Sequence, residues 1–329
     1  MKTDEFQDWM KKTASFDGFY DRSQNAPILQ DPNQATDRRK YIGGSDAPVI
    51  LGLSPWRTPY QLYQDKITPP VENPSKRRIL QRGHALEPYV LGILAREESL
   101  EITGVNNRYR DGEHDFIACE VDAEFHDNET NSIQNIEIKT SMFGNRAWGE
   151  EYTDSIPVYY QAQAMHGLMV TGRQVCVFGV LIGIDDFRVY RIQRDDEIIA
   201  GMRQQEVEFW QRIKNQNPPE ATTPEDTMKM YPKDDGSTIE LTGEMLNHYN
   251  ALIHANQIID EYSRCAEDCK NALKLAMNQA TALTLDGKPL VTWKAQSTSR
   301  FDTNAFKEAN PELYEQFKKT TDTRVFRVK

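Results

Sequence analysis

The sequence is poor in cysteine and has no long apolar run. Its 329 residues include only four cysteines, and none of them belongs to a C-x-x-C pair. Such a chain offers no disulfide framework, so we expect it to work in a reducing compartment such as the cytoplasm. No run of eighteen apolar residues occurs, so we expect no membrane-spanning helix. The first residues carry acids and no apolar core, and we expect no secretory signal there.

The charge of the chain is negative but unevenly spread. The formal net charge of −11 argues against a nucleic-acid binder, because phosphate contacts need Lys and Arg. However, residues 111–137 contain nine Asp and Glu and no base, whereas residues 76–82 contain four bases and no acid. An acid-rich block is either solvated surface or a source of metal ligands. The net charge alone therefore does not decide whether the chain binds nucleic acid.

The hydrophobic pattern predicts an α/β region followed by a mainly helical one. Predicted helices cover residues 75–99, 156–172, 195–216 and 242–281, and predicted strands cover 116–125, 133–140, 174–183 and 186–194. The Pro- and Thr-rich stretch 217–226 is the predicted boundary, and Asp286-Gly287 predicts a hairpin beyond it. The expected divisions are a peripheral segment, a core domain and a C-terminal extension, over residues 1–36, 37–216 and 227–329.

Three charged residues on neighbouring predicted strands suggest chemistry. Glu137 and Lys139 are two positions apart in "IEIKT", so their side chains share one face while Ile136 and Ile138 face the core. Asp122, on the preceding strand, is within reach of them. Two carboxylates beside an ammonium suit Mg²⁺-dependent phosphodiester cleavage, because Mg²⁺ prefers oxygen ligands, keeps several waters and activates one of them. Most E-x-K pairs in strands are plain surface pairs, so these residues alone leave both interpretations open.

The order of several motifs is more specific than any one of them. An Arg seven residues before a Ser is followed by "RGHALEP", an Asp, "EIK" and "YYQAQ", all between residues 37 and 215. This arrangement resembles the YqaJ-type viral recombinase nucleases, the group that includes phage lambda exonuclease, within the PD-(D/E)XK nuclease superfamily. The stretch "IGGSDAPVILGLSPWRTPYQLYQDK" is also similar to the opening signature of that family.

The resemblance implies a role for each matching residue. It makes Lys139 the catalytic lysine and puts Gln161 near the reacting phosphate or water, with Gln163 close by. The acidic catalytic residues and metal ligands that it implies are Asp122, Glu137, the carbonyl of Ile138, and Glu87. It implies that Arg38 and Ser45 hold the terminal 5′-phosphate of DNA. The chain departs from the family's S-P-D-G pattern, reading "CEVDAEF", so the resemblance assigns no further phosphate-contacting Ser.

The paired glycines in "YIGGSDAPVI" fit such a phosphate pocket. Gly43 and Gly44 would let backbone N–H groups approach a phosphate near a helix N-terminus, and Asp46 would cap that helix. A Gly-Gly turn before a capped helix, with no ligand, is the alternative. Trp56 and Tyr60 would either stack on DNA bases or pack in the core. The basic cluster supplies further candidate DNA contacts: Lys76, Arg77, Arg78 and Arg82.

The predicted fold class is α/β, with a PD-(D/E)XK restriction-endonuclease-like core (a central mixed sheet flanked by helices) and a mainly helical C-terminal extension. The implied function is Mg²⁺-dependent 5′-to-3′ digestion of linear double-stranded DNA, leaving 3′ overhangs for a single-strand annealing recombinase. The resemblance also implies two Mg²⁺ ions per site, replaceable by Mn²⁺, a ring-shaped homotrimer, and a phage or prophage protein in a bacterial cytoplasm. Two alternatives stay open: a structure-specific or nicking endonuclease on the same core, and a catalytically silent DNA-binding or assembly protein.

Overall fold

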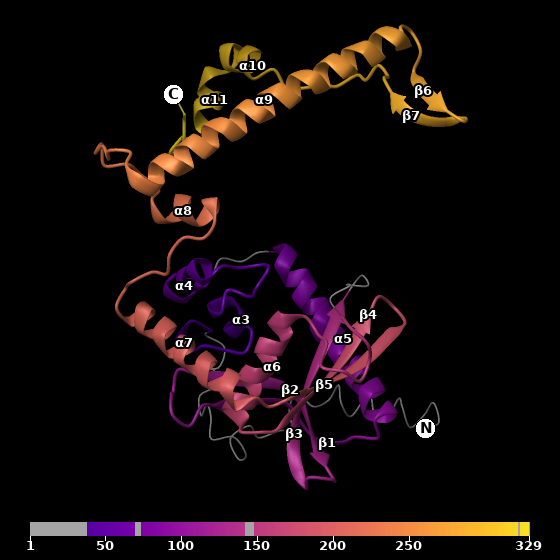
Figure 1. Ribbon diagram of the computed structural model, residues 1–329, viewed down its shortest axis with the longest axis vertical. Helices are drawn as coiled ribbons and strands as arrows, with labels where there is room; N and C mark the ends of the chain where they lie inside the picture. The colour runs from indigo at the N-terminus through magenta and orange to yellow at the C-terminus, as the bar shows by residue number, and fades with distance from the viewer. Residues whose placement is uncertain (1–37, 70–73, 142–147, 322, 329) are drawn as a thin grey trace. The chain divides into compact units, whose positions relative to one another are not determined.

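The structure is a computed structural model that describes residues 38–69, 74–141, 148–321 and 323–328, with the backbone alone for 74–80. The predicted peripheral segment 1–36 lies outside the described residues. The chain divides into two compact units, an N-terminal unit that ends at Met230 and a C-terminal unit that begins at Tyr231. The elements of each unit are labelled in Figure 1.

A five-stranded sheet in the order β1-β2-β3-β4-β5 forms the centre of the N-terminal unit. Its strands are β1 (Glu101–Arg110), β2 (Ala118–Asp127), β3 (Ser132–Ser141), β4 (Val175–Ile182) and β5 (Asp186–Gln193). β3 and β4 are parallel and the other neighbours are antiparallel, so the sheet is mixed. Strands β2 to β5 confirm the predicted strands, whereas β1 was not predicted.

Helices cover both faces of this sheet (Figure 1). Helix α5 (Pro74–Glu97) packs Val90 and Leu94 against Ile136 and Ile138 on one face. On the opposite face, α6 (Val158–Thr171) packs on the sheet, and α3 (Ala47–Ile50), α4 (Pro59–Ile67) and α7 (Asp196–Lys214) belong to the same hydrophobic core. The predicted fold class, an α/β core with a mixed sheet between helices and a mainly helical extension, is confirmed.

Local signals explain where several of these helices begin and end. Asp195 caps α7 by accepting hydrogen bonds from the first backbone N–H groups, and Thr58 and Gln61 form a capping box on α4. Gly172 ends α6 in the left-handed region, with φ of 72°, which costs glycine little. Helix α5 continues through Pro88 without a break.

Two short elements lie at the margins of the N-terminal unit. The 3-10 helix η2 (Arg38–Lys40) precedes the paired glycines, and α8 (Pro224–Met230) follows the Pro- and Thr-rich stretch. Asp226 of α8 is fully buried and accepts a hydrogen bond of 2.9 Å from the Gln61 side chain on α4. Because this bond joins residues far apart in the chain, α8 packs as part of the N-terminal unit.

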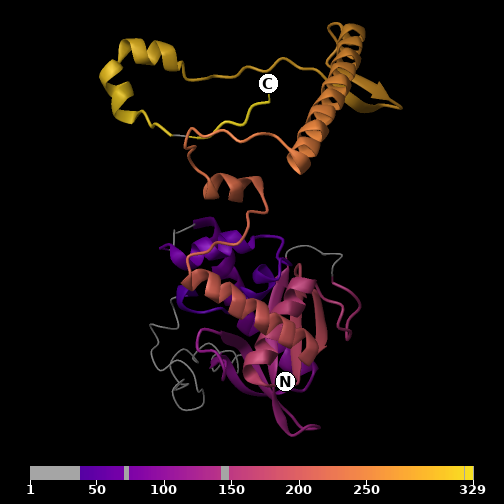
Figure 2. The ribbon, with the colours of Figure 1, turned by 60° about the vertical axis from the view of Figure 1, so that its left-hand side comes forward.

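The C-terminal unit is built on one long helix. It contains α9 (Gly243–Met277), β6 (Ala282–Leu285), β7 (Lys288–Thr292), α10 (Thr303–Ala309) and α11 (Pro311–Phe317). Figure 2 shows α9 as a single rod, and Figure 1 shows the β6–β7 hairpin next to its C-terminal end. Asp286 and Gly287 form the hairpin turn with φ of 51° and 77°, as predicted. None of the described helices is both long and apolar enough to cross a membrane.

Candidate active site

Strands β2 and β3 stop pairing where the acidic residues lie. Their last backbone pair in this direction is Ala123 with Ile136. Two residues further along β3, the N–H of Ile138 donates instead to the carboxylate of Asp122, at 2.7 Å. The N–H and C=O of one strand residue point to the same edge, so the Ile138 carbonyl also faces this opening beside Asp122.

Glu137 and Lys139 share a face of β3, as predicted. The Lys139 ammonium lies 3.0 Å from Glu137 Oε2, and the Gln163 amide of α6 donates to Glu137 Oε1 at 2.5 Å. Ile136 and Ile138 are buried on the opposite face, against α5. The Glu137 carboxylate is thus fixed from two sides, by its own strand and by the covering helix.

The ionisation of these groups follows from their mutual proximity. Burial, together with repulsion by Asp122, raises the pKa of Glu137 to about 8. Burial alone would lower the pKa of Lys139, but Glu137 and Asp122 outweigh it and raise the pKa, so the lysine is an ammonium. Burial and then Asp122 also raise the pKa of Glu87 on α5. Clustered carboxylates of this kind bind a cation favourably, because a cation offsets their repulsion.

The residues fit a divalent metal that takes few protein ligands. Within the described residues, no three His, Cys, Asp or Glu side chains form a cluster that could hold a metal by themselves. The opening between β2 and β3 offers two carboxylates, from Asp122 and Glu137, and the Ile138 carbonyl. Mg²⁺ typically binds one or two carboxylates and keeps several waters, so this donor set suits it.

Two other predicted catalytic residues lie further out. Glu87 is 3.3 Å from the exposed His84 ring one turn earlier on α5. The charges of Asp122 and Lys139 both act on its pKa, which Asp122 raises and Lys139 lowers. Gln161 donates to the backbone carbonyl of Asp154 at 2.9 Å. The glutamine that contacts Glu137 is therefore Gln163, and the role predicted for Gln161 stays a prediction.

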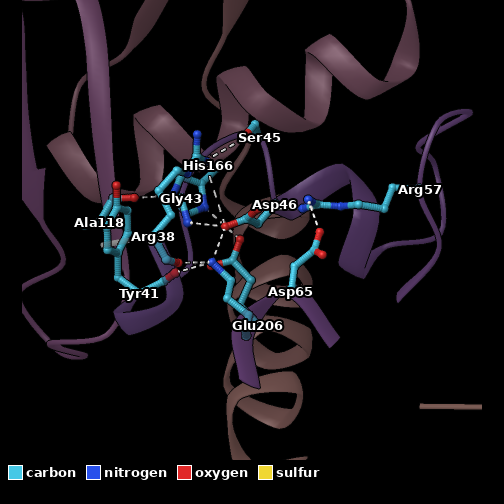
Figure 3. A network of polar contacts seen from close by, with 11 residues as sticks. Arg38, Tyr41, Gly43, Ser45, Asp46, Arg57, Asp65, Ala118, His166 and Glu206 are labelled. Atoms are coloured by element: carbon cyan, nitrogen blue, oxygen red, sulfur yellow. Dashed lines mark hydrogen bonds and ion pairs between the residues drawn. The ribbon is translucent and has the colours of Figure 1, made fainter. Parts of the chain in front are cut away.

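Arg38 and Ser45, the predicted phosphate-binding pair, are in direct contact. The Arg38 guanidinium donates to Ser45 Oγ at 2.6 Å while 57% of the Arg38 side chain stays exposed (Figure 3). The glycines act through close packing, since neither has a positive φ. A Cβ on Gly43 would lie 3.2 Å from Arg38 Nη2, and one on Gly44 would lie 3.3 Å from Gln163 Cγ. The turn that carries the pair is therefore pressed directly against α6.

Asp46 does not cap the helix, contrary to the prediction. It stands at the N-cap position of α3, but its carboxylate makes no cap hydrogen bond. It accepts instead from Lys66 at 2.7 Å, Arg57 at 3.0 Å and the Gly43 N–H at 3.1 Å (Figure 3). Stronger, charged partners displace the cap. The expectation that Gly43 offers its N–H to a phosphate is therefore also wrong, because Asp46 occupies it.

Lys66 connects this turn to α4. The Lys66 side chain is 3% exposed, and its ammonium donates to the carbonyls of Arg38 and Tyr41, each at 2.5 Å, as well as to Asp46. Lysine has three donors, so all of them are used. Burial alone would raise the pKa of Asp46, but Lys66 and Arg38 outweigh it and lower the pKa, which keeps the carboxylate ionised. The backbone that carries Arg38 is thus held by a buried ion pair that the sequence did not reveal.

A second buried pair lies behind the glycine turn. His166 of α6 places Nδ1 2.7 Å from Glu206 of α7 and Nε2 3.0 Å from the carbonyl of Ala118, and it is fully buried (Figure 3). A carboxylate and a carbonyl both accept hydrogen bonds, so this arrangement favours protons on both ring nitrogens of His166. Burial opposes the resulting charge, but Glu206 outweighs it and raises the pKa of His166.

The remaining candidates separate into exposed and buried positions. Tyr60 is 2% exposed and belongs to the core, whereas Trp56 is 68% exposed. Arg82 is half-buried on α5. The side chains of the other three basic residues lie outside the described residues: Lys76, Arg77 and Arg78.

Comparisons with known proteins agree with this arrangement. Residues 35–174 match the family model of the YqaJ-like viral recombinase domain. The chain is 30% identical over 302 residues to the uncharacterized protein YqaJ of Bacillus subtilis (strain 168), covering 89% of this chain and 92% of that protein. The chain therefore belongs to the YqaJ-like viral recombinase family, and the resemblance read from the motifs is confirmed.

Two solved structures are similar to parts of the chain. An alkaline exonuclease, LHK-Exo from Laribacter hongkongensis, is 20% identical with a TM-score of 0.42, covering 55% of this chain and 91% of its own. A phage-related exonuclease from Haemophilus somnus 129PT is 15% identical with a TM-score of 0.40, covering 54% of this chain and 94% of its own. Both likenesses involve about half of the present chain.

Proposed function

We propose that this protein is a Mg²⁺-dependent exonuclease that digests the 5′-ended strand of linear double-stranded DNA and leaves a 3′ overhang. The observation that carries the proposal is the opening between β2 and β3, where Asp122, the Ile138 backbone, Glu137 and Lys139 converge. Membership of a viral recombinase family supports a DNA substrate.

The residues divide the work between the metal, the water and the DNA end. Asp122, Glu137 and the Ile138 carbonyl would hold Mg²⁺, which Mn²⁺ could replace, with Glu87 as a further ligand for a second ion. When bound, the metal supplies an activated water and neutralises charge on the phosphate. Lys139, whose ammonium lies 3.0 Å from Glu137, would orient that water, and Gln163 holds Glu137 in place. Gln161 is proposed to move towards the phosphate when DNA binds.

Arg38 and Ser45 are proposed to hold the terminal 5′-phosphate. The exposed guanidinium and the adjacent hydroxyl supply a charged and a neutral donor at one spot. Gly44 packs against the same Gln163 that contacts Glu137. Gln163 therefore lies between the phosphate pocket and the opening between β2 and β3. A phosphate held in the pocket would place the first phosphodiester of the strand towards Lys139.

The proposal extends to partners and assembly. A 3′ overhang is the substrate of a single-strand annealing recombinase, which we propose as the partner in a bacterial cell that carries the phage or prophage. A ring-shaped homotrimer would keep an acidic protein on DNA, because only the inner channel need be basic. Size exclusion with light scattering tests this point, and a monomer at working concentration would remove the ring from the proposal.

The proposed activity can be tested with linear duplex DNA labelled at one 5′ end, with and without a 5′-phosphate. The intact protein with Mg²⁺ should release labelled mononucleotide, faster from the phosphorylated end. Lys139→Ala should abolish release, whereas Lys214→Ala, the same change on the exposed face of α7, should leave it unchanged. Arg38→Ala should reduce the preference for the phosphate more than it reduces digestion of the hydroxyl end.

Other outcomes distinguish the alternatives. Cutting of covalently closed circular DNA would favour an endonuclease that uses the same metal site over the proposed exonuclease. Failure of the intact protein to cleave either substrate, with Mg²⁺ or with Mn²⁺, would favour a silent DNA-binding protein.

A further inference from the structure

Trp56 is exposed yet held in place. Its side chain is 68% exposed in the loop between α3 and α4, and its ring contacts Tyr159 of α6 edge to face, with centroids 4.6 Å apart. The exposed part of a tryptophan side chain contributes no burial free energy to folding. A fixed aromatic ring that remains exposed is suited to stacking with a ligand.

A row of aromatic rings joins Trp56 to the candidate catalytic lysine. Tyr159 contacts Tyr160 with centroids 4.6 Å apart, and the Lys139 ammonium lies 5.5 Å from the centre of the Tyr160 ring. Tyr159 and Tyr160 thus link Trp56 to Lys139 through successive contacts. The exposed ring therefore lies at the edge of the same site, within a few nucleotide lengths of the acidic opening.

The loop that carries Trp56 is also tied to the phosphate pocket. The next residue, Arg57, bonds Asp46 at 3.0 Å and Asp65 at 2.9 Å, and Asp46 in turn accepts from the Gly43 N–H. The Trp56 N–H bonds Ser54 Oγ at 3.3 Å. With both flanks hydrogen-bonded, the indole is pre-organised and would lose little conformational freedom on binding a base.

We propose that Trp56 is a stacking platform for a nucleobase next to the 5′ end of the DNA strand that enters the acidic opening. This inference rests on the proposed function and adds to it a contact to the base. Stacking on an aromatic side chain tolerates any base, since every base has a π face. The platform would hold the end of the strand in place without selecting sequence.

A binding cycle that removes the ring and the base separately tests the platform. The DNA is a hairpin with one open, 5′-phosphorylated end and a dye in its loop, and anisotropy gives the dissociation constant in EDTA. Intact DNA is compared with DNA lacking the first or the second base of the 5′ strand. We expect Trp56→Ala to weaken binding of intact DNA about 5- to 100-fold. At one of the two positions, removal of the base should weaken binding to the wild type by a similar factor. The same removal should change the affinity of Trp56→Ala little.

Controls separate stacking from a general defect. Trp56→Phe should recover most of the affinity, and Trp293→Ala, which removes an exposed tryptophan of the C-terminal unit, should leave the cycle unchanged. If the losses from ring removal and base removal simply multiply at both positions, Trp56 does not stack on either base and the inference is wrong. Digestion of the same hairpin by the wild type with Mg²⁺ tests the proposed function independently, because it can succeed while the cycle fails.

Discussion

Lys66 offers a sharp test of how the proposed phosphate pocket is supported. The substitution Lys66→Met keeps most of the length and apolar volume of the side chain and removes its charge. It leaves the carbonyls of Arg38 and Tyr41 without their buried donor, and it leaves Asp46, which is 3% exposed, with Arg57 as its main charged partner. We therefore expect a large loss of stability from a residue that lies outside the acidic opening.

The magnitude follows from the burial of the pair. Breaking a buried ion pair by removing one partner costs about 3–5 kcal/mol of unfolding free energy. Lys66→Met should fall near the lower value, because Arg57 still neutralises Asp46 at 3.0 Å. Asp46→Asn should cost as much or more, since Lys66 then keeps only carbonyl partners. The double variant should be no less stable than the worse single variant, because it leaves no unpaired charge.

Urea denaturation of the full-length chain provides the assay. The buried Trp148 and Trp210 report the N-terminal unit by fluorescence. With a denaturant slope of about 2–3 kcal/mol per M, the expected loss lowers the midpoint by about 1–2.5 M. Lys229→Met removes an exposed lysine paired with Glu225 and serves as the matched control, with little or no change.

The same pair fixes the direction of an acid effect. The pKa of Asp46 is lowered in the folded state, so its contribution is present above the unfolded value of about 3.9 and is lost as pH falls through the folded value. Asp46→Asn should therefore flatten the acid limb of the stability curve. A Lys66→Met midpoint equal to that of Lys229→Met, or single-variant losses that add fully in the double variant, would refute the reasoning.

Three other features give outcomes that separate measurements can check. Cys265 and Cys269 are exposed, whereas burial raises the pKa of the two cysteines of the sheet, so a thiol reagent should label two sites in the native protein and four after unfolding; four fast sites would contradict the packing. The pKa of His166 is raised in the folded state, so its contribution to stability is full below the unfolded value of about 6.5 and is lost as pH rises through the folded value; His166→Gln should flatten the resulting fall in urea midpoint, and parallel curves would count against a protonated His166. Asp226→Ala removes the partner of Gln61, so trypsin should cut α8 faster, and an unchanged rate would mean that other contacts hold this helix.

The alternating pattern of the strands was enough to predict that Glu137 and Lys139 share one face of the sheet. A period of two places Glu137 beside Lys139 wherever the strand lies, and motif order identified Asp122 as their partner. The sequence did not reveal that pairing ends at Ala123 and Ile136, because the loss of a ladder bond depends on two strands at once. The bond from the Ile138 N–H to Asp122 is a consequence of that ending.

Strand β1 shows the limit of local patterns. Its sequence "EITGVNNRYR" has few apolar residues, a glycine at position 104 and an asparagine at 106 with φ of 53°. Its pairing with β2 shifts register between Ile102 and Gly104. Strand propensity is weak at an irregular edge, where neighbouring strands supply the order.

The buried ion pairs were also beyond the sequence. Lys66 of α4 bonds Asp46, which precedes α3, across twenty positions, and His166 of α6 bonds Glu206 of α7 across forty. No periodicity links such positions, so only the packing of the helices brings them together. The expected helix cap at Asp46 was wrong for the same reason: Lys66 and Arg57, distant in sequence, compete for its oxygens.

The contact between Gly44 and Gln163 sets a fixed length scale. Backbone that packs against a helix moves much less than a hinged loop does. The distance from Ser45 to Glu137 is therefore nearly constant. On the proposed function, that distance determines which phosphodiester meets the metal once the end is seated. The fixed distance between the two sites would then set the length of the released fragment. Gly44→Ala, by changing that distance, should alter the lengths of the products before it alters the affinity for DNA.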